Sequence, residues 1–249
     1  MPRRALVNSV PKAGTHLLKR GLALLPGVQA LDLHFDIRQP AGDVRASLLG
    51  LPPGAAATAH LVHSPEYVAA LRGLDLAHLL VLRDPRDVAL SLAEYIPTLR
   101  AHYLHDTFAG LSLEQRLTAC ICGLAEPRPS WDSVALHDVG ALFAQFLPWA
   151  GEPGVCCLRF EDLVGEAGGG DAGRQRDALR RVAGALDVPL DGATLAAVAG
   201  GIFDRNSPTF RSGEIGGWRQ RFGPEHVRAF KDVAGPLLVE LGYERGLDW

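Results

Sequence analysis

Four short apolar runs are spaced along the chain, and helical patterns lie between or after them. The runs are ALVNS (5–9), AATAHLV (56–62), HLLVLR (78–83) and GVCCLRF (154–160). Short runs that are apolar almost throughout are typical of strands buried on both faces. The pattern therefore predicts four buried strands separated by longer segments.

Helix-start signals mark several of those segments. A first helix is predicted from Thr15 to the breaker at 26–27. In SPEYVAALRG, Ser64 is a good N-cap and Pro65 suits the first helical position. Asp84 caps a third helix in DPRDVALSLAEYI. Further helical patterns cover residues 133–147, 174–186, 191–200 and 225–241.

Strands that alternate with helices predict an α/β fold with three layers, in which helices flank a central parallel sheet on both faces. Ligands of such sheets bind beyond the carboxyl ends of the strands. Residues 1–249 are expected to form a single domain. Residues 165–173 are expected to be a flexible surface loop, and the less regular segment 94–132 a lid or acceptor-binding insertion, or else an ordinary surface excursion.

Composition narrows the functions that such a fold could carry. The chain has 249 residues, 47% of them apolar, and a net charge of −3, so it is not built to coat nucleic acid or anionic membranes. No run approaches the ~20 apolar residues of a membrane span, and MPRRALVNSV lacks the apolar stretch of a signal peptide. A cytoplasmic location is expected. Four cysteines are interpreted as reduced core thiols, with a redox or metal role as the alternative: Cys120, Cys122, Cys156 and Cys157.

The hexapeptide PKAGTH (11–16) joins the first strand to the first helix and has the character of an anion-binding turn. Gly14 permits a tight turn, and the amides of Gly14, Thr15 and His16 then point outward at a helix N-terminus. Lys12 adds a point charge and Pro11 stiffens the approach. The lysine precedes the glycine, unlike in the usual P-loop. The alternative is an ordinary loop-to-helix junction.

Two further segments could hold phosphate. Arg83 ends an apolar strand, and Ser91 lies two helical turns further on; alternatively, Arg83 pairs with Asp84 or Asp87. The segment FRSGEIGGWRQRF (210–222) is basic and rich in glycine, so its amides and guanidinium groups could close over a phosphate, although a solvated loop would look similar.

Together, these three motifs resemble those of the PAPS-dependent sulfotransferases, in the same order, and the chain is similar to the soluble, cytosolic-type bacterial members. PAPS is 3'-phosphoadenosine 5'-phosphosulfate. PKAGTH looks like the family's 5'-phosphosulfate loop, usually PKSGTT or PKAGTT, RDPRDVALS looks like its 3'-phosphate motif, and FRSGEIGGW looks like its RKGxxGxW segment. The resemblance implies a P-loop-like fold and PAPS as the cofactor, with 3'-phosphoadenosine 5'-phosphate (PAP) as its product.

The resemblance also implies a role for each matching residue. His16 stands where the family has a second threonine, Leu17 where it often has a tryptophan on adenine, and Ser212 where it has a lysine. Phe160 replaces a tyrosine that often contacts adenine. The resemblance implies that Lys12, Gly14, Thr15 and His16 hold the 5'-phosphosulfate, that Arg83, Ser91, Arg211 and Gly213 hold the 3'-phosphate, and that Leu17, Phe160 and Trp218 lie at the base. The other expected cofactor-binding residues are Pro11, Ala13, Phe210 and Ser212.

A histidine after the second predicted strand is the catalytic base in this family. TAHLVHSPE offers two, and His60 matches the family motif better than His63, which is expected to shape the acceptor pocket or to face solvent. A buried structural histidine is the alternative. Histidine near its free pKa suits removal of a proton from a hydroxyl, and Lys12 would meet the charge on the leaving phosphate. The aromatic and histidine content of 94–132 suggests Tyr95, His102 and Tyr103 as acceptor contacts.

The sequence therefore predicts a sulfotransferase that moves a sulfuryl group from PAPS to a hydroxyl of a small-molecule or sugar acceptor, without a metal. A P-loop nucleotide kinase and a catalytically inactive PAP- or PAPS-binding protein are the alternatives. No nucleic-acid or membrane partner is expected. Animal relatives often pair through a KxxxTVxxxE segment, but Gly223 and Pro224 replace its TV here, so a monomer or a different dimer is expected.

Overall fold

The computed structural model describes residues 1–124, 136–203 and 213–249. The chain divides into two compact units. The sheet unit comprises Met1–Arg83 and Gln145–Ile215, and the helical unit comprises Asp84–Ala144 and Gly216–Trp249. Each is described separately. The prediction of a single sulfotransferase domain stays a prediction.

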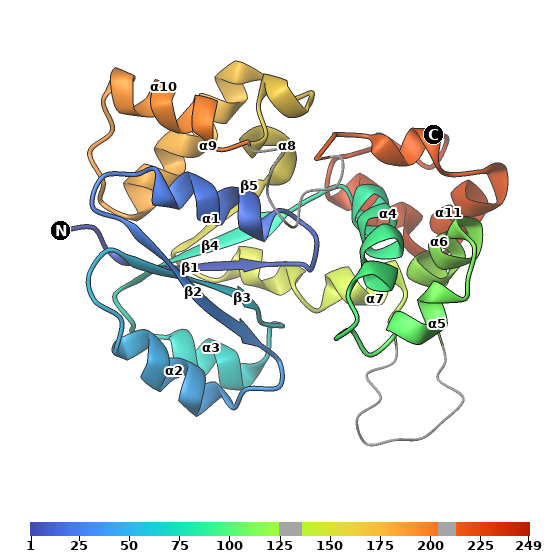
Figure 1. Ribbon diagram of the computed structural model, residues 1–249, viewed down its shortest axis with the longest axis horizontal. Helices are drawn as coiled ribbons and strands as arrows, with labels where there is room; N and C mark the ends of the chain where they lie inside the picture. Colours follow the sequence, from blue (N-terminus) through green and yellow to red (C-terminus); the bar gives the residue numbers. More distant parts are fainter. Residues whose placement is uncertain (125–135, 204–212) are drawn as a thin grey trace. The chain divides into compact units, whose positions relative to one another are not determined.

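A five-stranded parallel sheet forms the centre of the sheet unit (Figure 1). Its strand order is β2-β3-β1-β4-β5, and every neighbouring pair is parallel. The three inner strands, β3, β1 and β4, are buried along nearly their whole length, as their apolar runs predict. The strands are β1 (Arg4–Ser9), β2 (Gln29–Asp36), β3 (Ala55–His60), β4 (Leu76–Leu82) and β5 (Val155–Arg159).

Helices cover both faces of this sheet, which confirms the predicted α/β class (Figure 1). One layer holds α1 (Thr15–Ala23), α9 (Ala172–Ala185) and α10 (Gly192–Gly201), and the other holds α2 (Ala41–Leu49) and α3 (Pro65–Leu71). Short helices α8 (Phe160–Leu163), η2 (Leu147–Gly151) and η3 (Glu166–Gly168) complete the unit.

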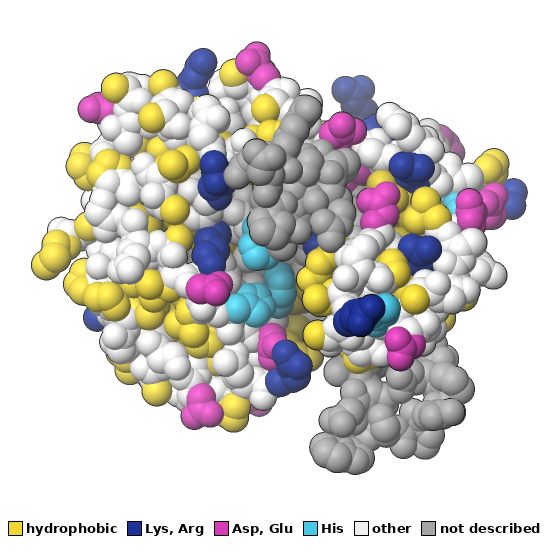
Figure 2. Space-filling view, viewed as in Figure 1, with side chains coloured by type: hydrophobic (Ala, Val, Ile, Leu, Met, Phe, Trp, Pro, Cys, Tyr) yellow, Lys and Arg dark blue, Asp and Glu magenta, His cyan; other side chains and the backbone are white. Residues whose placement is uncertain are grey.

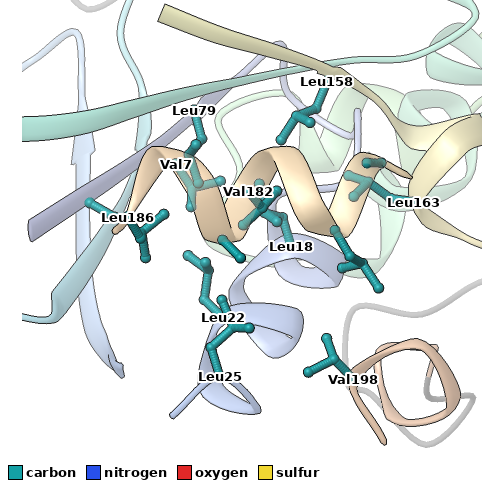
Figure 3. Packing of buried hydrophobic residues seen from close by; sticks show 14 of the residues in the cluster. Val7, Leu18, Leu22, Leu25, Leu79, Leu158, Leu163, Val182, Leu186 and Val198 are labelled. Carbon is teal, nitrogen blue, oxygen red and sulfur yellow. The ribbon is translucent and has the colours of Figure 1, made fainter. Parts of the chain in front are cut away.

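The first layer packs on the sheet through branched aliphatic side chains (Figure 3). Val7 and Leu79 of the central strands, Leu18 of α1 and Val198 of α10 are fully buried in this cluster. Each such side chain contributes roughly 1.5–3 kcal/mol relative to an exposed one. The layer therefore fixes α1, whose first residue follows the candidate anion-binding turn.

The sequence analysis missed β2. Its sequence QALDLHFD alternates apolar and polar residues and contains no continuous apolar run. Such alternation is typical of a strand with one exposed face, and β2 is an edge strand whose Phe35 is buried while His34 is exposed. A search for continuous apolar runs misses a strand whose residues alternate in this way.

The helical unit contains α4 (Pro85–Tyr95), α5 (His105–Ala109), α6 (Leu113–Cys122), α7 (Val139–Ala144) and α11 (Pro224–Glu240), with the short helices η1 (Ile96–Thr98) and η4 (Gly217–Gln220). Helix α6 packs against α4 and α11. The expectation that 94–132 is irregular is wrong for α5 and α6. The start of α6 is a capping box of Ser112 and Gln115, a signal that the sequence contains. The lid role of 94–132 stays a prediction.

Three smaller expectations also need correction. Residues 165–173 are not loop throughout, because they contain η3 and the start of α9, and the Gly170 amide donates to the Gly165 carbonyl at 2.8 Å. All four cysteines are free thiols, but only Cys120 is buried, and Cys122 is exposed rather than in the core. The helix predicted over 133–147 is confined to 139–144 within the described residues.

None of the helices in the described ranges is long and apolar enough to cross a bilayer.

Candidate active site

The turn between β1 and α1 has the geometry of an anion cradle. The Ala13 amide donates to the Val10 carbonyl at 3.0 Å, and both Lys12 and Gly14 have positive φ, 68° and 114°. Gly14 is the N-cap of α1 and supplies no side-chain cap, so the first amides of the helix are not satisfied by a side chain. Amides in that position, at the positive end of the helix dipole, bind anions.

Glycine is required at position 14 for two reasons. Its φ is unfavourable for any residue with a Cβ, and a Cβ there would lie 2.8 Å from Cδ2 of Phe160. The Phe160 ring lies beneath the Arg83 guanidinium, 4.2 Å from its centroid, and is 5% exposed. Little of this ring is available for adenine, and the predicted contact of Phe160 with the base stays a prediction.

Arg83 brings the predicted motifs of the sheet unit together. It follows the last residue of β4, is 7% exposed, and donates to the Lys12 carbonyl at 3.4 Å and to the Glu214 carbonyl at 3.0 Å. The anion-binding turn, the end of β4 and the segment beside Gly213 therefore meet at one guanidinium. The turn follows β1 and Arg83 follows β4, so both lie at the carboxyl end of the parallel sheet, where ligands of such sheets bind.

The histidine at the end of β3 is held in one tautomer. Nδ1 of His60 lies 2.9 Å from the Ser9 carbonyl oxygen. Because a carbonyl can only accept, Nδ1 carries the proton, and Nε2 of the neutral ring is an acceptor. The backbone of the next residue, Leu61, is held by two hydrogen bonds. The Asn8 side chain donates to the Leu61 carbonyl at 3.0 Å and accepts from the Leu61 amide at 2.9 Å. These partners could not be predicted from a local pattern, because they depend on the register of β1 against β3.

Burial, with smaller contributions from the nearby His34, His16 and Lys12, lowers the pKa of His60 to about 4, although the hydrogen bond to Ser9 opposes the shift. The expectation of a histidine near its free pKa is therefore corrected. At neutral pH the ring is uncharged and its Nε2 can accept a proton, but it is a weaker base than free imidazole.

Two more histidines surround His60, and the sequence analysis identified only one of them. His16, on the first turn of α1, is exposed, and burial of part of its ring, followed by Lys12, lowers its pKa. His34 of β2 was missed with its strand; its ring meets that of His60 edge to face, with centroids 4.8 Å apart. Figure 2 shows histidine side chains gathered on the surface of the sheet unit. The alternation of β2 is the signal that could have revealed His34.

His63 has a different environment. Its Nε2 lies 2.9 Å from Oε1 of Glu152, its amide donates to the Gln145 carbonyl at 2.6 Å, and its ring packs edge-on against Trp149. These contacts favour a structural role. The proposed part of His63 in acceptor binding stays a prediction.

Comparisons with known proteins identify the architecture. No family model and no curated protein matches the chain. Among solved structures, mouse sulfotransferase SULT7A1 complexed with PAP is similar, with a TM-score of 0.70 and 16% identity over 96% of this chain and 86% of that one. The chain has the sulfotransferase fold. Retinol dehydratase matches as well, with 14% identity and 94% of this chain covered in both structures. The TM-score is 0.61 for its complex with androsterone and inactive cofactor PAP (80% of that chain) and 0.63 for its complex with retinol and PAP (81%).

Within this sulfotransferase fold, the described part of the sheet unit holds most of the predicted cofactor contacts. Pro11 to His16 form the turn, Leu17 is half-buried on α1, and Gly213 has a φ of 60°. Phe210, Arg211 and Ser212 lie outside the described residues. In the described ranges, no group of three or more His, Cys, Asp or Glu side chains could hold a metal ion.

The remaining predicted residues belong to the helical unit. Trp218 is 7% exposed, its ring lies 4.1 Å from the Arg86 guanidinium, and its amide donates to Asp87 at 3.1 Å. This packing favours a structural role over stacking on adenine. Ser91 is half-buried on α4, Tyr95 ends that helix, and the ring of His102 stacks on that of Tyr103, with centroids 4.7 Å apart. Their roles in binding stay predictions.

Proposed function

We propose that this protein transfers a sulfuryl group from PAPS to a hydroxyl group of a small-molecule or sugar acceptor. The observation that carries the proposal is the pairing of an uncapped, glycine-shaped turn with a neutral histidine whose Nε2 is an acceptor. Lys12 and His16 of that turn lie close enough to His60 to lower its pKa. The anion site and the proton acceptor are thus neighbours.

The anion site fits the phosphosulfate end of PAPS. The amides at the start of α1, the Thr15 hydroxyl and the Lys12 ammonium are donors of the kind that bind phosphate and sulfate. Thr15 is buried and shares a hydrogen bond of 2.5 Å with Ser9, which keeps its hydroxyl at the turn. Arg83, Ser91, Arg211 and Gly213 are proposed to hold the 3'-phosphate.

The proposed reaction needs one proton transfer and one displacement at sulfur. His60 Nε2 takes the proton of the acceptor hydroxyl while its oxygen forms the new S–O bond. The bond between sulfur and the bridging phosphate oxygen breaks in line, and PAP leaves with the bonding electron pair. Lys12 and the turn amides stabilise the charge that develops on the leaving phosphate. Sulfuryl transfer, like phosphoryl transfer, passes through a loose transition state, so its rate depends mainly on positioning and on stabilisation of charge.

A screen with sulfur-labelled PAPS against a mixed library of sugars, alcohols and phenols tests the proposal. The expected result is a labelled sulfate ester together with an equal amount of PAP. Magnesium-dependent turnover of ATP would instead support a nucleotide kinase. Tight binding of PAP without transfer to any acceptor would identify an inactive binding protein.

A further inference from the structure

Four polar side chains, His34, Asp36, Thr58 and His60, share one face of the sheet at its β2 edge. In the pairing of β2 with β3, His34 is opposite Thr58 and Asp36 is opposite His60. Alternate residues of a strand share a face, so Thr58 and His60 are on the same face, and His34 joins them. An irregularity between Ala30 and His34 shifts the register and sets this alignment.

The tautomer of His34 is fixed by a short chain of hydrogen bonds. The Thr58 hydroxyl donates to the Leu33 carbonyl at 3.2 Å, so its oxygen accepts from Nδ1 of His34 at 2.9 Å. Nδ1 therefore carries the proton, and Nε2 is an acceptor. His60 reaches the same state through the Ser9 carbonyl. Two imidazoles whose centroids are 4.8 Å apart thus each offer an acceptor nitrogen.

His34 also remains uncharged at neutral pH. Burial of part of the ring lowers its pKa, the Asp36 carboxylate opposes that shift, and Lys19 and Arg38 add to it. The nearest charged side chains form ion pairs with groups other than His34: Asp36 pairs with Arg38, and Lys19 pairs with Asp32. No hydrogen bond from the described residues reaches Nε2 of His34, and the residue is exposed. This nitrogen therefore belongs to an exposed ring that lies beside the ring of His60.

We infer that His34 is a specificity-determining residue that accepts a hydrogen bond from a second hydroxyl of the acceptor. The acceptor class is accordingly a polyol or sugar with neighbouring hydroxyls, rather than a monohydroxy alcohol or phenol. An acceptor with one hydroxyl would leave Nε2 of His34 to water, whereas a second hydroxyl could bond to it directly, and sites built for a hydroxyl discriminate against analogues that lack it. This inference rests on the proposed function.

The test compares two probes that differ by one hydroxyl, cyclohexanol and 1,2-cyclohexanediol, with labelled PAPS. For the wild-type protein, kcat/KM is expected to be higher for one of the diol isomers. In His34→Phe the ratio of diol to monoalcohol should fall about threefold to tenfold, the worth of one neutral hydrogen bond. His34→Gln, which keeps an acceptor atom, should restore part of the ratio. Asp32→Asn, two residues away on the same exposed strand face, is the matched control and should leave the ratio unchanged.

Thr58→Val provides an independent variant that keeps the His34 ring. It removes the hydroxyl that fixes the tautomer, so KM for the diol should rise more than kcat falls, with unchanged affinity for PAP. Equal wild-type values for diol and monoalcohol, or a ratio that His34→Phe, His34→Gln and Thr58→Val all leave unchanged, would overturn the inference. Absence of transfer to both probes and to the wider acceptor library would overturn the proposed function itself, and the inference with it.

Discussion

Arg83 and Arg86 lie three residues apart and are both buried, but they are bonded to different kinds of group. Arg83, in the sheet unit, donates to the carbonyls of Lys12 and Glu214 and lies over Phe160. It thereby ties together the loops that contain the predicted cofactor contacts.

Arg86, in the helical unit, is 1% exposed and is held by carboxylates, at 2.8 Å from Asp84 and 2.5 Å from Glu244. Its guanidinium also lies over the rings of Trp218 and Trp249. Two arginines of one short motif are thus bonded differently: Arg83 to backbone carbonyls of the sheet unit, and Arg86 to carboxylates of the helical unit.

The largest effect is expected when Arg86 is replaced. Arg86→Met leaves two carboxylates without their partner, and breaking a buried ion pair typically costs about 3–5 kcal/mol. Urea unfolding should show that loss. Arg180→Met, which removes an exposed pair with Asp177, is the control and should cost less than about 1 kcal/mol. Equal stability of the two variants would contradict a structural role for Arg86.

Replacing Arg83 should weaken nucleotide binding more than it lowers the stability of the fold. Hydrogen bonds to charged groups are worth roughly 1.5–3 kcal/mol, so Arg83→Ala should weaken PAP binding about tenfold to hundredfold. The affinity of Arg83→Ala for 5'-AMP, which lacks the 3'-phosphate, should barely differ from that of the wild-type protein. Calorimetry with both nucleotides measures the difference. Equal losses for both would show that Arg83 acts only by tying the loops together.

Features with a local sequence pattern could be predicted, whereas features that depend on how distant strands pair could not. Continuous apolar runs predicted β1, β3, β4 and β5, and the end of one such run marked Arg83 as a candidate phosphate contact. The alternating strand β2 and its His34 were missed because half of that strand faces outward. The bond from His60 to the Ser9 carbonyl depends on the register of two strands, which no local pattern encodes.

A smaller effect, on the pH dependence of stability, is expected for His78, a buried histidine of the sheet unit. Burial lowers the pKa of His78 to about 4, as for His60, but His78 lies inside β4 against Trp149. The unfolded chain then binds more protons than the folded one between about pH 6.5 and 4, so stability should fall as the pH drops through that window.

His78→Phe, which keeps a ring against Trp149, should remove part of that dependence, on the order of 1–2 kcal/mol between pH 7 and 5. Unfolding measured at both pH values gives the slope, and His137→Gln at an exposed position is the control. An unchanged slope in His78→Phe would show that His78 does not contribute to it.

Turnover of His60→Ala on an identified acceptor tests the central claim most directly. General-base catalysis is typically worth ~10²–10⁴, so the variant should lose at least about a hundredfold in kcat while its affinity for PAP is unchanged. Because the neutral ring is the active form and burial lowers its pKa to about 4, the wild-type rate should fall only as the pH drops toward that value, and His60→Ala should lack this fall. Full turnover in His60→Ala, with His63→Ala inactive, would contradict the account and move the base to His63.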